Sequence, residues 1–165
     1  MTFWLFQILN GVSFGILLFL LASGLSLIYG LMRILNLAHG SFYLLGGYIG
    51  LVLLRQTGSF VVAAVGASLA VAAFGIVVER LLLRRLHLRE LPQVLLTFGL
   101  LLVISDLTLL QWGGVPETVP KPELFSRSIQ LGSMYYPSYR LFIIVFGFTV
   151  ASALWWIQER TRIGA

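Results

Sequence analysis

Cysteine is absent from this 165-residue chain, and charged residues make up only 10% of it. The lack of cysteine excludes disulfide bonds, thiolate metal sites and a cysteine nucleophile. Ordinary globular domains carry about 25% charged residues, whereas 59% of the residues here are hydrophobic. The composition therefore predicts an integral membrane protein.

Side chains that carry enzyme chemistry are also scarce. The two histidines, His39 and His87, stand too far apart in the sequence to form a metal site by spacing. No glycine-rich phosphate loop with a following lysine occurs. We therefore expect no enzyme activity, metal or cofactor, and any ATP must be hydrolysed by another chain.

The chain is basic, with 11 lysines and arginines against 6 acidic residues. These basic residues lie in the gaps between apolar runs. This placement indicates loops at the inner face of a membrane, in contact with lipid, and argues against nucleic-acid binding.

Five stretches of the chain are apolar and nearly free of charge. A helix needs about 20 such residues to cross the hydrocarbon core. The expected spans cover residues 3–29, 34–54, 56–78, 91–112 and 141–158. The sequence thus predicts an all-α polytopic membrane helix bundle, with residues 1–165 as a single transmembrane domain.

The loop at residues 80–90 sets the expected orientation, because it contains four arginines and basic loops stay inside. Counting spans from it places the N-terminus outside and the tail at 158–165 in the cytoplasm. Residues 111–140 then form an external loop, and their prolines predict irregular structure.

The apolar pattern breaks near residues 33–41, around Arg33, Asn36 and His39. A broken membrane helix is tolerated where protein or a water-filled cavity surrounds it. The resumed helix would present amides and a positive dipole end to a carboxylate or carbonyl group. The alternative is a short cytoplasmic turn, with Asn36 as a cap and His39 directed at lipid headgroups.

Asp106 is the one acidic residue inside the expected fourth span. It could pair with an arginine such as Arg33, hydrogen-bond a neighbouring helix, or meet a substrate amine. A satisfied buried polar network is the interpretation we favour. Two small-xxx-small patterns, Gly11 with Gly15 and Gly46 with Gly50, predict close helix packing within the chain.

Several of these residues form a pattern that resembles the permease subunits of branched-chain amino acid ABC importers. The matching residues include Gly24–Leu25, Tyr29–Gly30, Arg33, Asn36, Ala38–His39–Gly40 and Gly47–Tyr48. The resemblance continues through LLTFGL at 95–100 and SDL at 105–107 to ERTRIGA at 159–165.

The resemblance implies inward transport of branched-chain amino acids, or close analogues, by alternating access in the inner cell membrane. It implies three kinds of partner: a second permease subunit, cytoplasmic ATPases and an external solute-binding protein. The substrate path would include Asn36, Ala38, His39, Gly40 and Ser41. The residues facing the ATPase would be Arg160, Thr161, Arg162 and Gly164.

Two features differ from the family pattern. Many relatives have an acidic residue where this chain has Ser41. Related permeases also transport urea or short amides. Family permeases are longer, so we expect this chain to be an N-terminal portion that lacks most of the ATPase-coupling loop. The alternatives left open are a passive small-solute channel or facilitator and a membrane scaffold.

Overall fold

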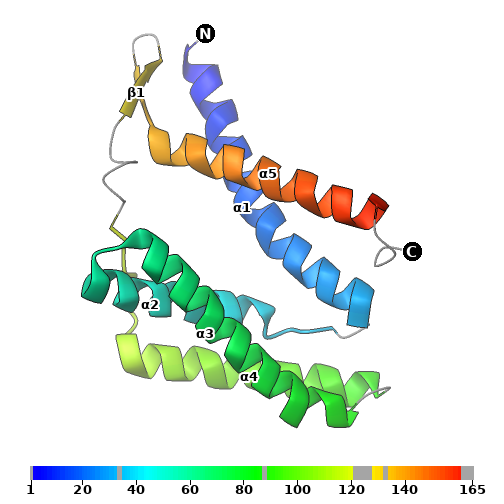
Figure 1. Cartoon of the computed structure of the whole chain (residues 1–165). Coiled ribbons are helices and arrows are strands. Elements are labelled where there is room, and N and C mark those ends of the chain that lie inside the picture. Colours follow the sequence, from blue (N-terminus) through cyan, green and yellow to red (C-terminus); the bar gives the residue numbers. More distant parts are fainter. Residues whose placement is uncertain (1, 33–34, 87–88, 121–127, 132–133, 161–165) are drawn as a thin grey trace. The chain divides into compact units, whose positions relative to one another are not determined.

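The computed structural model describes residues 2–32, 35–86, 89–120, 128–131 and 134–160. Its helices and strands, in chain order (Figure 1), are α1 (Thr2–Met32), α2 (His39–Thr57), α3 (Phe60–Leu81), the 3-10 helix η1 (Leu83–Leu86), α4 (Glu90–Trp112), β1 (Ser128–Leu131), β2 (Met134–Pro137) and α5 (Ser138–Arg160). The prediction of an all-α polytopic membrane protein is confirmed, and four of the five expected spans qualify as membrane spans among the described residues.

Four of the helices are long and apolar enough to cross a membrane. They span Phe3–Gly30, Phe60–Leu86, Glu90–Trp112 and Ser138–Arg160. The most apolar part of each is at most 22% buried, so the apolar side chains face outward, as they do toward lipid or partner helices. Helix α2 falls short of this composition because its 19 residues include His39, Arg55 and four glycines.

The chain divides into two compact units, which we describe separately. One contains residues 1–24 and 120–165, and the other contains residues 25–119. The division falls inside α1.

The expected break lies in the larger unit, between α1 and α2. Helix α1 ends at Met32 and α2 begins at His39, with Leu35–Ala38 outside any helix. The side-chain oxygen of Asn36 accepts a hydrogen bond from the Ala38 N–H at 3.1 Å, and the Asn36 carbonyl accepts one from the His39 N–H at 3.2 Å. An asparagine that bonds the backbone two residues on forms a turn in place of a helix. The predicted broken helix is confirmed, with its resumption at His39.

A tight turn connects α2 to α3. Gly58 adopts the left-handed conformation with φ +64°, and its N–H donates to the Leu54 carbonyl at 2.9 Å. This geometry satisfies a carbonyl at the end of α2, and glycine adopts it without strain. The Ser59 hydroxyl then caps α3 by accepting from the Val62 N–H at 3.5 Å.

Small residues let α2 and α3 pack closely along their length. A Cβ added at Gly46 would lie 3.3 Å from the Val71 side chain, and one added at Gly50 would lie 3.6 Å from Ala67. The predicted role of Gly46 and Gly50 in packing within the chain is confirmed. Gly11 and Gly15 differ, because nothing described lies within 4 Å of a Cβ at either position.

The segment connecting α3 to α4 is shorter than the loop expected at 80–90. Helix α3 continues to Leu81, and η1 follows almost at once before α4 begins at Glu90. The Gln93 side chain donates to the Leu86 carbonyl at 2.9 Å, which ties the start of α4 to the end of η1.

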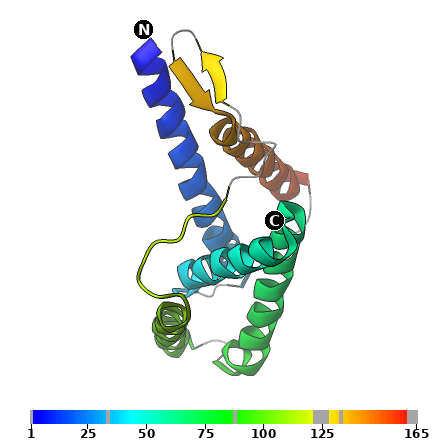
Figure 2. The same cartoon turned by 90° about the vertical axis from the view of Figure 1, so that its left-hand side faces the viewer.

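The segment at 111–140 contains regular structure where an irregular loop was expected. Strands β1 and β2 pair antiparallel, with Ile129 opposite Tyr136 and Gln130 opposite Tyr135 (Figure 2). The β-branched and aromatic residues in these strands favour pairing, which the proline count did not reveal. Tyr136 is only 1% exposed, because its ring packs edge-on against Phe6 of α1.

In the same unit, α5 contacts α1 at two further points. The Arg140 guanidinium donates a hydrogen bond to the side-chain oxygen of Asn10. Gly147 lies against the Ile16 side chain, where a larger residue would not fit. Polar and packing contacts between α1 and the segment from β2 to α5 therefore help to hold the smaller unit together.

Replacing Gly50 with leucine should separate α2 from α3, because the added side chain has to enter the space held by Ala67. Overpacking of this kind costs about 1–3 kcal/mol, so we expect a clear fall in the thermal unfolding midpoint measured in detergent. Gly47→Leu is the matched control, since a Cβ at Gly47 meets nothing within 4 Å. Equal midpoints for the two variants would contradict the packing described here.

Candidate functional site

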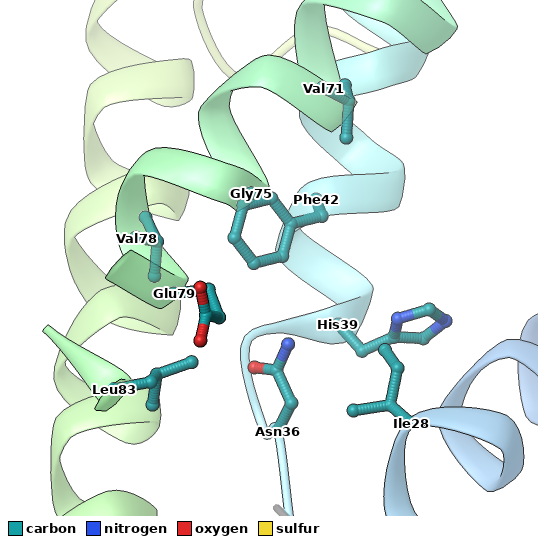
Figure 3. Close-up of a pocket in the computed structure, with 9 residues that line it drawn as sticks. All are labelled: Ile28, Asn36, His39, Phe42, Val71, Gly75, Val78, Glu79 and Leu83. Atoms are coloured by element: carbon teal, nitrogen blue, oxygen red, sulfur yellow. The ribbon is translucent and has the colours of Figure 1, made fainter. Parts of the chain in front are cut away.

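A cavity of about 280 Å³ lies at the helix break, within the larger unit. Its lining residues are Ile28, Asn36, His39, Phe42, Val71, Gly75, Val78, Glu79 and Leu83 (Figure 3). They come from the end of α1, the break, the start of α2, the last turns of α3 and η1. Four helix ends thus meet around one space, which is near the lower limit of roughly 300 Å³ for ligand sites.

Asn36 contributes a side-chain amide to this cavity. It is 9% exposed, and its oxygen is occupied by the hydrogen bond from the Ala38 N–H. Figure 3 shows the side-chain nitrogen directed into the cavity. Among the residues that the structure describes, this nitrogen has no hydrogen-bond partner, so it can donate to a solute.

Glu79 and His39 are the ionisable residues of the lining. Glu79 is half-buried on α3, and its carboxylate points toward the same space as the Asn36 amide (Figure 3). No hydrogen bond or ion pair joins it to another described residue. The His39 imidazole lies beside Ile28, on the α1 side of the cavity.

The remaining wall is apolar and belongs to the core of the unit. Val78 and Leu83 are 5% and 7% exposed and pack with the half-buried Phe42. The Phe42 ring also contacts Phe74, with the ring centres 5.5 Å apart. The cavity therefore combines a firm apolar wall with three polar groups.

A second cavity, of about 400 Å³, lies on the other side of the break. Its lining consists of Tyr29, Gly30, Leu35, Glu90, Gln93 and Val94. Leu35 borders this cavity and Asn36 borders the first one, so the non-helical segment has open space along both sides. A break placed between two cavities matches the condition under which irregular backbone is tolerated at membrane depth.

Helix α4 holds the break in position through neutral polar side chains. Thr97 is fully buried, and its hydroxyl oxygen lies 3.2 Å from the Leu35 carbonyl and 3.1 Å from the Val94 carbonyl. The hydroxyl has a single proton, so these two carbonyls share one donor. Ser105, two turns further along α4, lies 3.4 Å from the Ser41 hydroxyl. Residues four and eight positions apart share a helix face, so one face of α4 contacts both the break and the start of α2.

The predicted path residues occupy different positions. Asn36 and His39 line the cavity. Ala38 is fully buried, Gly40 is exposed, and Ser41 is buried with its hydroxyl donating to the Leu101 carbonyl of α4 at 3.3 Å. These three residues do not line the cavity, and Ser41 connects α2 to α4.

The other predicted residues do not gather at the cavity. Asp106 is exposed on α4, and Arg33 lies outside the described residues, so their polar network stays a prediction. Arg160 is exposed at the end of α5. Thr161, Arg162 and Gly164 lie outside the described residues.

Sequence reasoning missed Glu79 and Thr97 as site residues. Glu79 had one visible signal, a carboxylate near the end of an apolar span, where an unpaired charge is costly. Thr97 and Ser105 had another, because they recur at helical spacing in an otherwise apolar run.

The membrane-length helices, the broken helix and the cavity at its ends define an α-helical integral membrane protein with a mainly apolar cavity that also contains three polar side chains. The family described as "Branched-chain amino acid transport system / permease component" matches residues 7–165. The chain belongs to this family.

Two curated relatives show the extent of the similarity. The high-affinity branched-chain amino acid transport system permease protein LivH of Escherichia coli (strain K12) is 29% identical over 134 residues, covering 75% of this chain and 43% of LivH. The corresponding protein BraD of Pseudomonas aeruginosa is 29% identical over 176 residues, covering 98% of this chain and 57% of BraD. The chain thus spans about half the length of these relatives. No solved structure matches it significantly.

Thr97→Val should destabilise the unit, because valine keeps the shape of threonine but leaves the Leu35 carbonyl without its donor. Hydrogen bonds between membrane helices contribute about 0.6–1.7 kcal/mol, so we expect a loss of that size in unfolding measurements. Thr108→Val is the control, since among the described residues that buried hydroxyl donates to the Ile104 carbonyl of its own helix and to no other helix. Equal losses in both variants would show that Thr97 does not hold the break.

Proposed function

We propose that the chain acts as a permease subunit of an ATP-driven importer for branched-chain amino acids or close analogues. Its solute passes the helix break beside Asn36 and His39. The observation that carries this proposal is the cavity at the break, which brings polar groups and an apolar wall together in a member of this permease family.

The physical reason for a break at such a site is the release of backbone polar groups. A continuous helix uses its own N–H and C=O groups, whereas a helix that begins at a break leaves N–H groups of its first turn without partners in the helix, where they can replace the water around a solute. The apolar wall receives a hydrocarbon side chain without cost. Alternating access then requires the helices around the break to open the cavity toward one side of the membrane at a time.

We propose an orientation from the charges at the ends of the helices in the larger unit. Asn36 at the break and Glu79 at the end of α3 line one cavity, so the arginines that follow α3 lie near the same end of the unit. By the positive-inside rule this end faces the cytoplasm. The far end of this unit, where Arg55 pairs with Glu117 at 2.8 Å, then faces outward. Counting spans along the sequence puts the N-terminus outside and the tail in the cytoplasm.

The remaining functions of the importer fall to other chains. A second permease subunit pairs with this one, cytoplasmic ATPases supply energy, and an external solute-binding protein delivers the solute. The C-terminal segment from Arg160 to Gly164 approaches the ATPase. The outward-facing apolar side chains of the spans agree with such assembly, because partner helices and lipid can cover them.

Leucine uptake by the assembled importer tests the proposal. Asn36→Ala should lower the uptake rate at least about 10-fold, because the lost amide can no longer hold the solute and the turn at the break is weakened. The level of the chain in the membrane and its co-purification with the ATPase should remain normal. Gln56→Ala, at the opposite end of α2, should transport normally.

Normal leucine uptake by Asn36→Ala would contradict the assignment of the path. Wild-type uptake that persists without ATP would instead identify a passive facilitator. Uptake of urea or acetamide without leucine would move the substrate class to short amides.

A further inference from the structure

An amino acid presents three different surfaces to any protein that carries it. Its α-ammonium group needs an acceptor, best a carboxylate, and its α-carboxylate needs N–H donors. A branched side chain needs an apolar wall. A site that holds the intact zwitterion therefore has to place these three kinds of surface around one small space.

The Glu79 carboxylate supplies the acceptor. It is half-buried near the end of α3 and points into the cavity (Figure 3). Arg84 and Arg85 of η1 are exposed, and Glu79 has no ion pair with any residue that the structure describes. A carboxylate that is half removed from water without a cation gains from a cationic ligand, because that ligand offsets the cost of its desolvation.

The Asn36 amide supplies the donor on the opposite side. Its nitrogen is directed into the cavity and has no partner in the described part of the chain, while the side chain is 9% exposed. Helix α2 begins three residues later, at His39, so its positive dipole end borders the same space. A carboxylate at this position would accept from the Asn36 amide within that field.

The wall between these two groups is hydrocarbon. Phe42, Val78 and Leu83 line it, and they belong to the packed core of the unit. Gly75 lines the wall from α3 and presents no side chain there. The cavity of about 280 Å³ suits a solute smaller than most ligands.

We propose that Glu79 binds the α-ammonium group of the amino acid at the inner end of the path, while Asn36 binds its α-carboxylate. The branched side chain lies against Phe42, Val78 and Leu83. This role rests on the transport function proposed above and adds which side chains recognise the charged groups of the solute. The site selects zwitterionic amino acids through Glu79, and it discriminates against uncharged amides and against keto acids of the same shape.

Ligand binding to the assembled importer in nanodiscs tests this role with two probes. Leucine carries the ammonium group, and 4-methyl-2-oxopentanoate has the same side chain and carboxylate without it. Glu79→Gln keeps the size of the side chain and removes its charge. We expect the Kd for leucine to rise about 10- to 100-fold, the effect of losing a charge-assisted hydrogen bond. The weak binding of the keto acid should change less than about twofold.

Two further variants act as controls. Glu90→Gln removes another acidic side chain, one that lines the second cavity and not this one, and should leave both Kd values unchanged. Glu79→Asp keeps the charge on a shorter side chain and should retain part of the preference for leucine over the keto acid. Thermal unfolding of each variant separates loss of binding from loss of folding.

The outcomes distinguish this role from the proposed function. If the wild-type importer transports leucine and Glu79→Gln binds leucine normally, the role of Glu79 is wrong and the transport function stands. Equal weakening of leucine and keto acid binding in Glu79→Gln would show a structural role for Glu79 and overturn this proposal. Unfolding of Glu79→Gln, together with no preference for leucine over the keto acid in Glu79→Asp, would do the same. Failure of the wild type to transport any amino acid would overturn the proposed function and this role together.

Discussion

The hydrogen bond from Thr97 to the carbonyl of Leu35 is the contact on which the site depends. A helix that breaks within a membrane protein releases backbone groups that lipid cannot satisfy. Here the Thr97 hydroxyl donates to the Leu35 carbonyl, and the Asn36 side-chain oxygen accepts from the Ala38 N–H. The Ser41 hydroxyl, at the start of α2, donates to the Leu101 carbonyl of α4. These contacts keep the break open at a fixed place, so a cavity forms between the helix ends.

The contacts at the break divide the unit into two functional parts. The face of α4 that carries Thr97 and Ser105 is a scaffold, because its polar groups are used within the protein. The cavity wall on the other side of the break carries the Asn36 side-chain nitrogen and the Glu79 carboxylate, which have no hydrogen-bond partner among the described residues. A transport path needs both parts, because a solute can exchange its hydration only for groups that are held in place and still free to bind.

Much of this architecture could be predicted from the sequence. The apolar runs determine the five helices, and the cluster at Arg33, Asn36 and His39 predicted the break, because local composition controls both. The cavity could not be predicted, since its wall brings together Asn36, Phe42 and Glu79 through tertiary packing. The charge of Asp106 predicted a polar network, whereas Asp106 is exposed and the neutral Thr97 contacts the break. The hairpin was missed because the prolines around it masked a short alternation of β-forming residues.

The central claim is that the helix break at Asn36 lines the solute path. Because the chain contains no cysteine, an Asn36→Cys substitution gives this chain a single thiol, whose reaction with a membrane-impermeant maleimide can be followed on this subunit in the assembled importer. We expect the reagent to modify this thiol from the cytoplasmic side and leucine to slow the modification, while the same reagent added from outside modifies a cysteine at the exposed Gln56 at a rate that leucine leaves unchanged. A thiol at position 36 that reacts equally fast with and without leucine, or that does not react at all, would contradict it.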